Sequence, residues 1–344
     1  MPTLLEEEIR SQPAILADLL DREAARIGAI VNALPPFDYV HIAARGSSDH
    51  AALYASYALA ALAGYPVSLA TPSLHSLYHL PPRLAGALVV GISQSGQSPD
   101  IVAVLEEGKR QGRPTLAITN DGASPLAGTA DHVVELHAGS ERSVAATKTY
   151  TAELLVIAAL AAQWSRDADR MAELRRLPET LAQALERDPR EAQRSERYRY
   201  MDHCAIIARG FNYATAHELA LKLKELTYVV ATAYSSADFR HGPIATIDPG
   251  FPALLVMPTG AAYDDMLDLA AELRRREAEL LVISDDPAAL ALATTPLALP
   301  LEAPEWLSPL VAVAPGQLLA LHLALTKGLN PDEPRGLRKV TRTL

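Results

Sequence analysis

Two patterns of apolar residues alternate along most of the chain. Compact apolar runs such as Tyr39–Ala44 and Ala87–Ile92 end at polar turns, and each is followed by a segment whose apolar residues recur every three or four positions. A compact run bounded by turn residues is typical of a buried strand, whereas the longer spacing is typical of a helix packed along one face. Strands that alternate with helices predict an α/β protein built on a parallel sheet that is covered on both faces.

The second half of the chain repeats the order of the first. Strands are predicted at 39–44, 87–92 and 115–119 in the first half, and at 205–208, 253–257 and 280–283 in the second. Matching landmarks lie 164 or 165 positions apart: Arg45 and Arg209, Gly96 and Gly260, Thr119 and Ser284. A constant offset of this kind indicates an internal duplication.

The remaining segments differ from these two halves. Residues 1–34 show helical spacing that ends at Pro35-Pro36, and the charged residues 165–197 predict a helical connector. We therefore expect five parts: an N-terminal helical segment (1–35), a first domain (36–164), the connector (165–197), a second domain (198–329) and a C-terminal tail (330–344).

Composition excludes several classes of protein. Hydrophobic residues make up 49% of the chain, which excludes intrinsic disorder. A balance of 31 basic and 41 acidic residues makes nucleic acid an unexpected partner, because such binders need a basic face. The single cysteine, Cys204, excludes an internal disulfide and a thiolate zinc cluster, and the ten histidines lack the spacing of metal sites, so no metal is predicted.

The sequence also predicts a protein that is neither secreted nor embedded in a membrane. The acidic start, Met1–Arg10, lacks the features of a signal peptide. The longest uninterrupted apolar run, Leu154–Ala162, has nine residues, whereas a membrane span needs about 20. We expect a soluble, cytoplasmic protein with no membrane partner.

A hydroxyl-rich turn follows the predicted strand 87–92. Its sequence is Ser93-Gln94-Ser95-Gly96-Gln97-Ser98, followed by Pro99 at the start of a helix. A helix N-terminus offers unpaired N–H groups, and nearby hydroxyls add donors, so the turn suits a phosphate monoester. The alternative is an ordinary polar turn with a helix cap. The matching turn of the second half, Pro258–Ala262, has lost most of these hydroxyls.

Two further groups offer acid/base chemistry. Glu218, Lys222 and Glu225 share one face of a predicted helix and could move protons between adjacent carbons of a sugar. The alternative is a solvated salt-bridge face. His241 precedes Gly242-Pro243 in a predicted turn and could act as an acid or base near neutral pH, although a lone loop histidine is often incidental.

Several motifs occur together in an order that resembles the sugar isomerase (SIS) double-domain family, which includes the isomerase part of glucosamine-6-phosphate synthase and stand-alone glucosamine-6-phosphate deaminases. The resemblance covers about residues 36–344 and implies two tandem flavodoxin-like SIS domains, each a parallel sheet flanked by helices, with a C-terminal tail. The motifs are Ala44–Ser48, Ser93–Gly96, Val144–Lys148, Glu218–Glu225, Arg240–Pro243 and Pro334–Leu337.

The resemblance also implies roles for individual residues. Glu225 would move the proton between C1 and C2 with Lys222 beside it, and Lys339 would hold an open-chain ketose. His241 would open the sugar ring from the partner subunit of a homodimer with shared sites. The phosphate would be bound by Ser93, Gln94, Ser95 and Ser98, with Ser48 on the phosphate or the sugar, and the sugar pocket would include Gly46, Ser47, Val144, Ala146 and Glu218.

The sequence departs from the family pattern at several places. Arg45 stands where the synthase carries a small residue, Gln97 replaces a glutamate, and Ala146 replaces a serine. The synthase begins with a glutaminase domain whose nucleophile is a terminal cysteine, whereas this sequence starts with Met1-Pro2 and Cys204 lies in mid-chain. We therefore expect that this chain does not obtain ammonia from glutamine by that route.

The expected function is an enzyme of amino sugar metabolism without a cofactor, which deaminates glucosamine-6-phosphate to fructose-6-phosphate and ammonia through an enolamine. One alternative is an aminotransferase-type isomerase that is independent of glutamine or depends on a partner. Another is a deglycase that acts on a different hexosamine phosphate. A non-catalytic sugar-phosphate sensor belongs to a different class, and it could keep the serine turn while losing Glu225 and His241, both of which are present.

Overall fold

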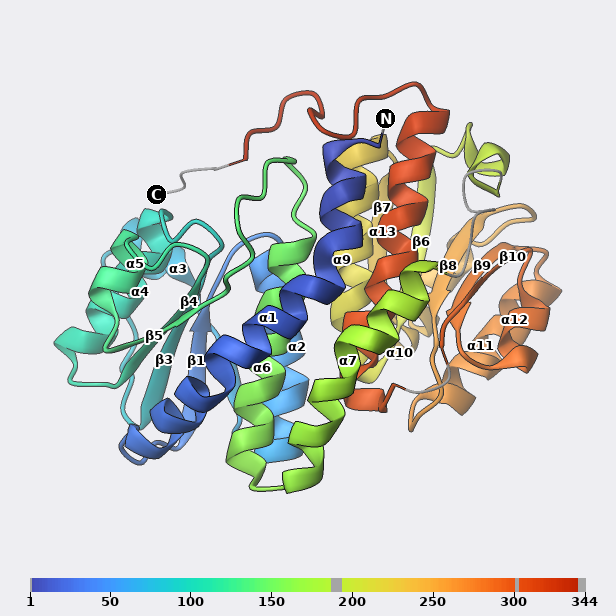
Figure 1. The fold of residues 1–344 in the computed structure, drawn as a ribbon. Coiled ribbons are helices and arrows are strands. Elements are labelled where there is room, and N and C mark those ends of the chain that lie inside the picture. The colour runs from blue at the N-terminus through green and yellow to red at the C-terminus, as the bar shows by residue number, and fades with distance from the viewer. Residues whose placement is uncertain (1, 187–193, 301–302, 340–344) are drawn as a thin grey trace. The chain divides into compact units, whose positions relative to one another are not determined.

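The computed structural model describes residues 2–186, 194–300 and 303–339, and Figure 1 shows their fold. Two five-stranded sheets are present, with strand orders β2-β1-β3-β4-β5 and β10-β9-β8-β6-β7. All neighbouring strands are parallel. The predicted class, an α/β fold with two tandem parallel sheets flanked by helices, is confirmed.

The first sheet is formed by residues from the first half of the chain. Every residue of β3 and β4 is buried, as expected for central strands covered by helices on both faces. The strands are β1 (Tyr39–Ala43), β2 (Val67–Leu69), β3 (Ala87–Ile92), β4 (Thr115–Thr119) and β5 (His132–Glu135). The helices are α2 (Ser47–Ala63), α3 (Pro72–Ser76), α4 (Pro99–Arg110), α5 (Pro125–Thr129) and α6 (Lys148–Ser165).

The second sheet has the corresponding elements from the second half. Its strands are β6 (His203–Ala208), β7 (Val230–Ser235), β8 (Pro252–Val256), β9 (Glu279–Ser284) and β10 (Thr295–Ala298). Its helices are α9 (Tyr213–Thr227), α10 (Ser236–Arg240), α11 (Tyr263–Arg275), α12 (Pro287–Leu292) and α13 (Ser308–Thr326). Short 3₁₀ turns lie at η1 (Glu196–Tyr198), η2 (Gly210–Asn212), η3 (Pro243–Thr246) and η4 (Glu305–Leu307).

The duplication is visible in the topology and in one repeated ion pair. In each half the first strand lies between the second and the third, so the two sheets have the same strand order. Arg45 Nε lies 2.9 Å from Asp100 Oδ2, and Arg209, at the matching position, lies 3.1 Å from Oδ2 of Asp265. Each pair joins the end of the first strand to the first turn of the helix after the third strand of its half.

The chain separates into two compact units that do not follow the sequence order. The first-sheet unit comprises Ala14–Glu141, Lys148–Arg176 and the residues from Arg338 onward. The second-sheet unit comprises the residues up to Pro13, Arg142–Thr147 and Leu177–Leu337. The division therefore cuts the helices α1 (Leu4–Ala33) and α7 (Ala168–Glu186), at or near the prolines that each contains. As a result, the segment with Val144 and Ala146 belongs to the same unit as α9.

One segment within the described residues is long and apolar enough to cross a membrane. It spans Glu305–Thr326, with mean hydropathy 1.5, and 83% of its apolar window is buried inside the protein. It includes α13, which packs against α9, where a Cβ on Gly316 would lie 2.3 Å from Leu219. The burial identifies it as a core helix. The sequence pattern did not predict this helix, because Gly316, Gln317 and His322 interrupt its apolar residues.

Candidate active site

Two candidate segments meet at the carboxyl ends of adjacent strands in the first sheet. Gly46, Ser47 and Ser48 follow β1, and the turn Ser93–Ser98 follows β3, which pairs with β1. The chain leaves β1 toward β2 on one side and β3 toward β4 on the other, so this is the point where the strand order reverses. Open parallel sheets bind ligands at such points.

The turn Ser93–Ser98 is shaped by a glycine and by hydrogen bonds among its own residues, in which the N–H groups of Gly96 and Gln97 donate to the hydroxyls of Ser93 and Ser95. Gly96 has φ +60°, and a Cβ there would lie 2.1 Å from Ser124 Oγ, so only glycine fits. The Gly96 N–H donates to Ser93 Oγ at 3.2 Å, which orients Ser93 within the turn. Ser98 occupies the N-cap position of α4, but its side chain makes no capping hydrogen bond. Helix capping therefore does not explain the hydroxyl of Ser98.

The matching turn of the second half is occupied by the protein's own carboxylates. Thr259 donates to Asp285 through its N–H at 2.7 Å and through its hydroxyl at 2.6 Å. The Ala261 N–H donates to Glu305 Oε2 at 3.0 Å. Since these donors are already paired with negative charges, this turn is unsuited to a phosphate. The second-half turn therefore differs from the first-half turn in two ways: it has fewer hydroxyls, and its donors are bound to carboxylates of the protein.

Ser48 is bound to a buried carboxylate that our sequence analysis did not single out. Its hydroxyl donates to Glu153 Oε1 at 2.8 Å, and the two residues are 7% and 1% exposed. Glu153 lies on α6, where every residue from Lys148 to Ala162 is buried. A carboxylate within such an apolar helix was the available signal. Because the Ser48 hydroxyl donates to Glu153, its oxygen remains only as a hydrogen-bond acceptor.

Helix α9 of the second-sheet unit carries the predicted proton-transfer residues. Lys222 Nζ lies 2.6 Å from Glu225 Oε2 and 3.3 Å from Glu218 Oε1. The side chains of Lys222 and Glu218 are 1% and 0% exposed, whereas that of Glu225 is 20% exposed. The alternative of a solvated salt-bridge face is therefore wrong. Of the three charged groups, Glu225 is the one that solvent reaches.

The segment Arg142–Thr147 is anchored in the same unit by the N-terminal helix. Glu8 of α1, which is 7% exposed, accepts the N–H of Arg142 at 2.6 Å and that of Ser143 at 3.3 Å. Val144 and Ala146 are partly exposed, whereas Ala145 and Thr147 are buried. The segment therefore presents every second residue, including both residues expected to line a sugar pocket. Glu8 was also missed by sequence reasoning, which treated α1 as a separate part.

His241 lies at the surface at the end of the short helix α10. Its N–H donates to the carbonyl of Asp238 at 3.0 Å, and the following Gly242 has φ +131°. The described interactions do not join His241 to Lys222 or Glu225. An exposed imidazole is available to a second molecule.

The C-terminal tail is held at two places. In the second-sheet unit, the Arg335 guanidinium lies 4.1 Å from the ring centre of Tyr228, the residue that ends α9, and the Arg335 N–H donates to the Tyr228 hydroxyl. In the first-sheet unit, Lys339 Nζ lies 2.5 Å from Oε2 of Glu141, which also accepts the Thr149 hydroxyl. The described part of the tail is thus ordered by specific contacts.

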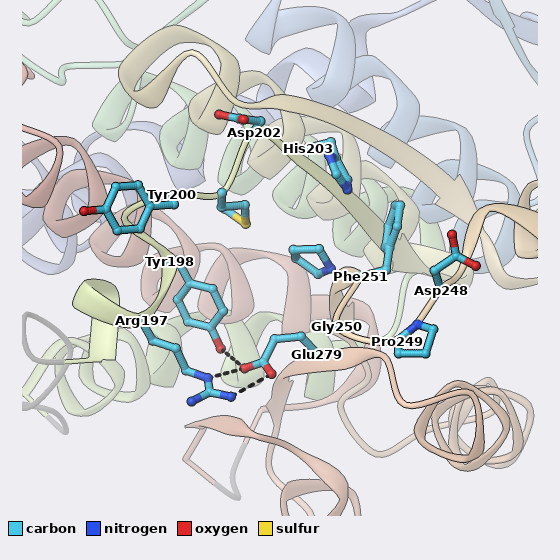
Figure 2. A pocket seen from close by; sticks show the side chains of 12 residues that line it. Arg197, Tyr198, Tyr200, Asp202, His203, Asp248, Pro249, Gly250, Phe251 and Glu279 are labelled. Carbon is cyan, nitrogen blue, oxygen red and sulfur yellow. Dashed lines mark hydrogen bonds and ion pairs between the residues drawn. The ribbon is translucent and has the colours of Figure 1, made fainter.

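A cavity of about 640 Å³ lies elsewhere, at the amino ends of β6, β8 and β9 (Figure 2). Three of its polar side chains are paired with one another, since Arg197 and Tyr198 both donate to Glu279. None of the predicted site residues lines it. It is therefore separate from the candidate site, which lies at the carboxyl ends of strands.

Cys204 lacks the properties of a nucleophile. It is 3% exposed, and burial raises the pKa of its thiol to about 12, so the thiolate is disfavoured at neutral pH. Within the described ranges, His, Cys, Asp and Glu side chains do not form a group of three that could hold a metal ion.

Comparisons with known proteins identify the family to which the two domains belong. The SIS domain profile matches residues 39–163 and 199–327. The glutamine–fructose-6-phosphate aminotransferase (isomerizing) of Gloeobacter violaceus is 35% identical over 353 residues, which cover 97% of this chain and 57% of that protein. The chain thus spans a little more than half of that relative.

Solved structures match over nearly the whole chain. The C-terminal domain of glucosamine-fructose-6-phosphate aminotransferase from Francisella tularensis has a TM-score of 0.88 at 27% identity, covering 97% of this chain and 99% of that one. A candidate phosphosugar isomerase from Silicibacter pomeroyi has a TM-score of 0.86 at 35% identity, covering 96% and 100%. The chain belongs to the SIS domain family, and its relatives are phosphosugar enzymes of the isomerase type, as the resemblance implied.

Proposed function

We propose that this protein is an isomerase of an amino sugar phosphate, which converts glucosamine-6-phosphate and water to fructose-6-phosphate and ammonia. The observation that carries the proposal is the buried Lys222, held between Glu218 and Glu225 with only Glu225 reaching solvent. Burying three charges costs several kcal/mol unless they pair. A proton transfer at carbon needs a carboxylate that the substrate can reach, and in this cluster Glu225 is that carboxylate.

Glu225 would act as the base. In the open-chain sugar it takes the proton from C2, which gives an enolamine, and returns a proton to C1. The product carries an imine at C2, and water replaces its nitrogen to leave the ketone and ammonia. Lys222 donates to Oε2 of Glu225 and so fixes the carboxylate against the substrate. No redox cofactor or metal takes part in these steps.

Ser93, Gln94, Ser95 and Ser98 would bind the phosphate at the N-terminus of α4. Ser48 would face the sugar rather than the phosphate, because its proton is already donated to Glu153. An acceptor backed by a buried carboxylate favours a donor such as a hydroxyl or an ammonium group.

The proposal includes a homodimer in the cytoplasm whose sites are shared between subunits. The exposed His241 supports it, because this side chain is free to reach a second molecule, where it would open the sugar ring. Dimers that combine one Glu225→Gln chain with one His241→Asn chain would then recover activity at one of their two sites. Verified hybrids that stay inactive would contradict shared sites.

The alternatives differ in nitrogen source, in sugar or in class. An aminotransferase-type isomerase would form glucosamine-6-phosphate from fructose-6-phosphate with ammonia or a partner's nitrogen. A deglycase would prefer another hexosamine phosphate, and a sensor would bind without turnover. The buried Lys222–Glu225 pair favours the enzymes over the sensor, since binding alone does not require it.

The test is a substrate panel. The pure protein is incubated with glucosamine-6-phosphate, galactosamine-6-phosphate, a fructosamine phosphate and unphosphorylated glucosamine, and released ammonia is measured. We expect release from glucosamine-6-phosphate, with glutamine neither consumed nor stimulatory. Stoichiometric conversion of glutamine to glutamate with fructose-6-phosphate as acceptor would overturn the proposal in favour of the synthase reaction.

A further inference from the structure

One carboxylate holds both ends of the short helix that leads into His241. Helix α10 runs from Ser236 to Arg240, and Asp265, on α11, contacts both of these residues. The Ser236 hydroxyl donates to Asp265 Oδ2, and Arg240 donates to Asp265 Oδ1 at 2.9 Å and to the Asp265 carbonyl at 3.0 Å. Arg209 pairs with the same carboxylate at 3.1 Å.

A helix of five residues is not stable by itself, because too few hydrogen bonds offset the cost of its first turn. Phe239, the fourth residue of α10, anchors one face of the helix, since it is fully buried in the core that packs against the second sheet. Arg240, the last residue of the helix, is 31% exposed. Asp265 supplies the contact that fixes this end, one residue before His241.

The internal duplication provides a comparison within the same chain. The helix α3 (Pro72–Ser76) occupies the position of α10 in the first half, and Asp100 occupies that of Asp265. Pro72 and Ser76 of α3 occupy the positions of Ser236 and Arg240 in α10. Both halves keep the arginine–aspartate pair, but only the half that carries His241 adds these two partners to the carboxylate.

We propose that Asp265 is a positioning residue for His241: it clamps α10 at both ends and thereby sets where the imidazole is presented. This inference rests on the proposed function for its kinetic consequence. Asp265 itself contacts neither sugar nor phosphate in this account. Its effect on turnover passes entirely through His241.

The first test of the clamp measures hydrogen exchange and does not depend on enzymatic activity. Amide hydrogen exchange of residues 236–241 is compared in the wild-type protein, in Asp265→Asn and in Asp264→Asn. Asp264 is the matched control, because it is exposed, lies on the same turn of α11 and loses the same charge. We expect exchange to rise several-fold in Asp265→Asn alone. Unchanged exchange in that variant would overturn the clamp.

The second test asks whether Asp265 acts through His241. We expect Asp265→Asn to lower kcat for ammonia release about 10- to 100-fold with KM unchanged, since small displacements of a reacting group have effects of this size. In a His241→Asn background the same substitution should cause no further loss, because residues that act as a unit are not additive. Asp264→Asn should leave kcat at the wild-type value.

The outcomes separate this inference from the proposed function. Losses that multiply in the double variant would overturn the inference, because Asp265 would then act on something other than His241, while the proposed function would stand. Full activity of His241→Asn would overturn the role of His241, and with it the kinetic part of the inference. A wild-type protein that releases no ammonia from any sugar of the panel refutes the proposed function, and the exchange experiment still decides the clamp.

Discussion

The substitution Glu225→Gln separates catalysis from stability at the buried cluster of α9. The amide keeps the size of the side chain, and its oxygen can still accept the 2.6 Å hydrogen bond from Lys222. What it removes is the base. A positioned general base contributes about 10²–10⁴ in rate, so kcat should fall by this factor, which corresponds to about 3–5 kcal/mol in the activation free energy.

The expected loss of stability is much smaller. Glu218 remains 3.3 Å from the Lys222 ammonium as a counter-charge, and the Glu225 side chain is partly exposed to water. We expect a destabilisation of less than about 2 kcal/mol, a shift of a few degrees in Tm. In contrast, Lys222→Met removes the ammonium group that faces both carboxylates and should cost about 3–5 kcal/mol.

The assay is steady-state ammonia release from glucosamine-6-phosphate, with Tm from calorimetry on the same samples. Glu272→Gln on α11 is the control, since it makes the same change at a partly exposed surface pair with Arg276. A Glu225→Gln protein whose kcat stays within a factor of about three of the wild type would refute the role of base. The cluster would then be a structural ion pair.

Three further predictions concern other parts of the molecule. Ser95→Ala should raise KM for the phosphorylated sugar about 10- to 100-fold with Tm unchanged, because one charge-assisted hydrogen bond to the phosphate is lost. If the wild-type protein turned over unphosphorylated glucosamine equally well, this turn would not be a phosphate site. Burial lowers the pKa of both His41 and His75, whose imidazoles are therefore neutral in the folded protein. A histidine in the unfolded chain has a pKa of about 6.5, so below this pH the unfolded state binds more protons than the folded state and the protein becomes less stable as the pH falls. When Tm is measured against pH, His75→Gln should make the acid decline of Tm less steep. A decline that is the same in the variant would show that His75 does not cause it. Ending the chain after Leu337 removes Lys339 but keeps Asp332, which accepts the N–H groups of Leu4 and Leu5 at the start of α1. Turnover should be lost in a folded protein whose Tm is lower, because the ion pair of Lys339 with the buried Glu141 is also lost. Full activity would rule out a role for the tail.

The elements of the core were predictable from local pattern, whereas the edges of the sheets were not. Each predicted strand has its counterpart in the structure, and β3 and β4 have the predicted bounds, because central strands are continuous apolar runs. The edge strands β2, β5, β7 and β10 were missed. They are short or partly exposed, and β10 contains a proline, so neither composition nor period distinguishes them from loops.

By itself, the sequence determined the α/β class, the duplication, the hydroxyl-rich turn and the shared helical face of Glu218, Lys222 and Glu225. These follow from residue order, because turns, caps and helical spacing act over a few residues. Only the tertiary structure decided that this face is buried, that Glu153 accepts a hydrogen bond from Ser48, and that Asp265 contacts the helix before His241. Each of these depends on which distant element packs against the residue. Burial and partners from distant parts of the chain set the free-energy cost of a charged group and the direction of its hydrogen bonds. A local sequence pattern contains neither.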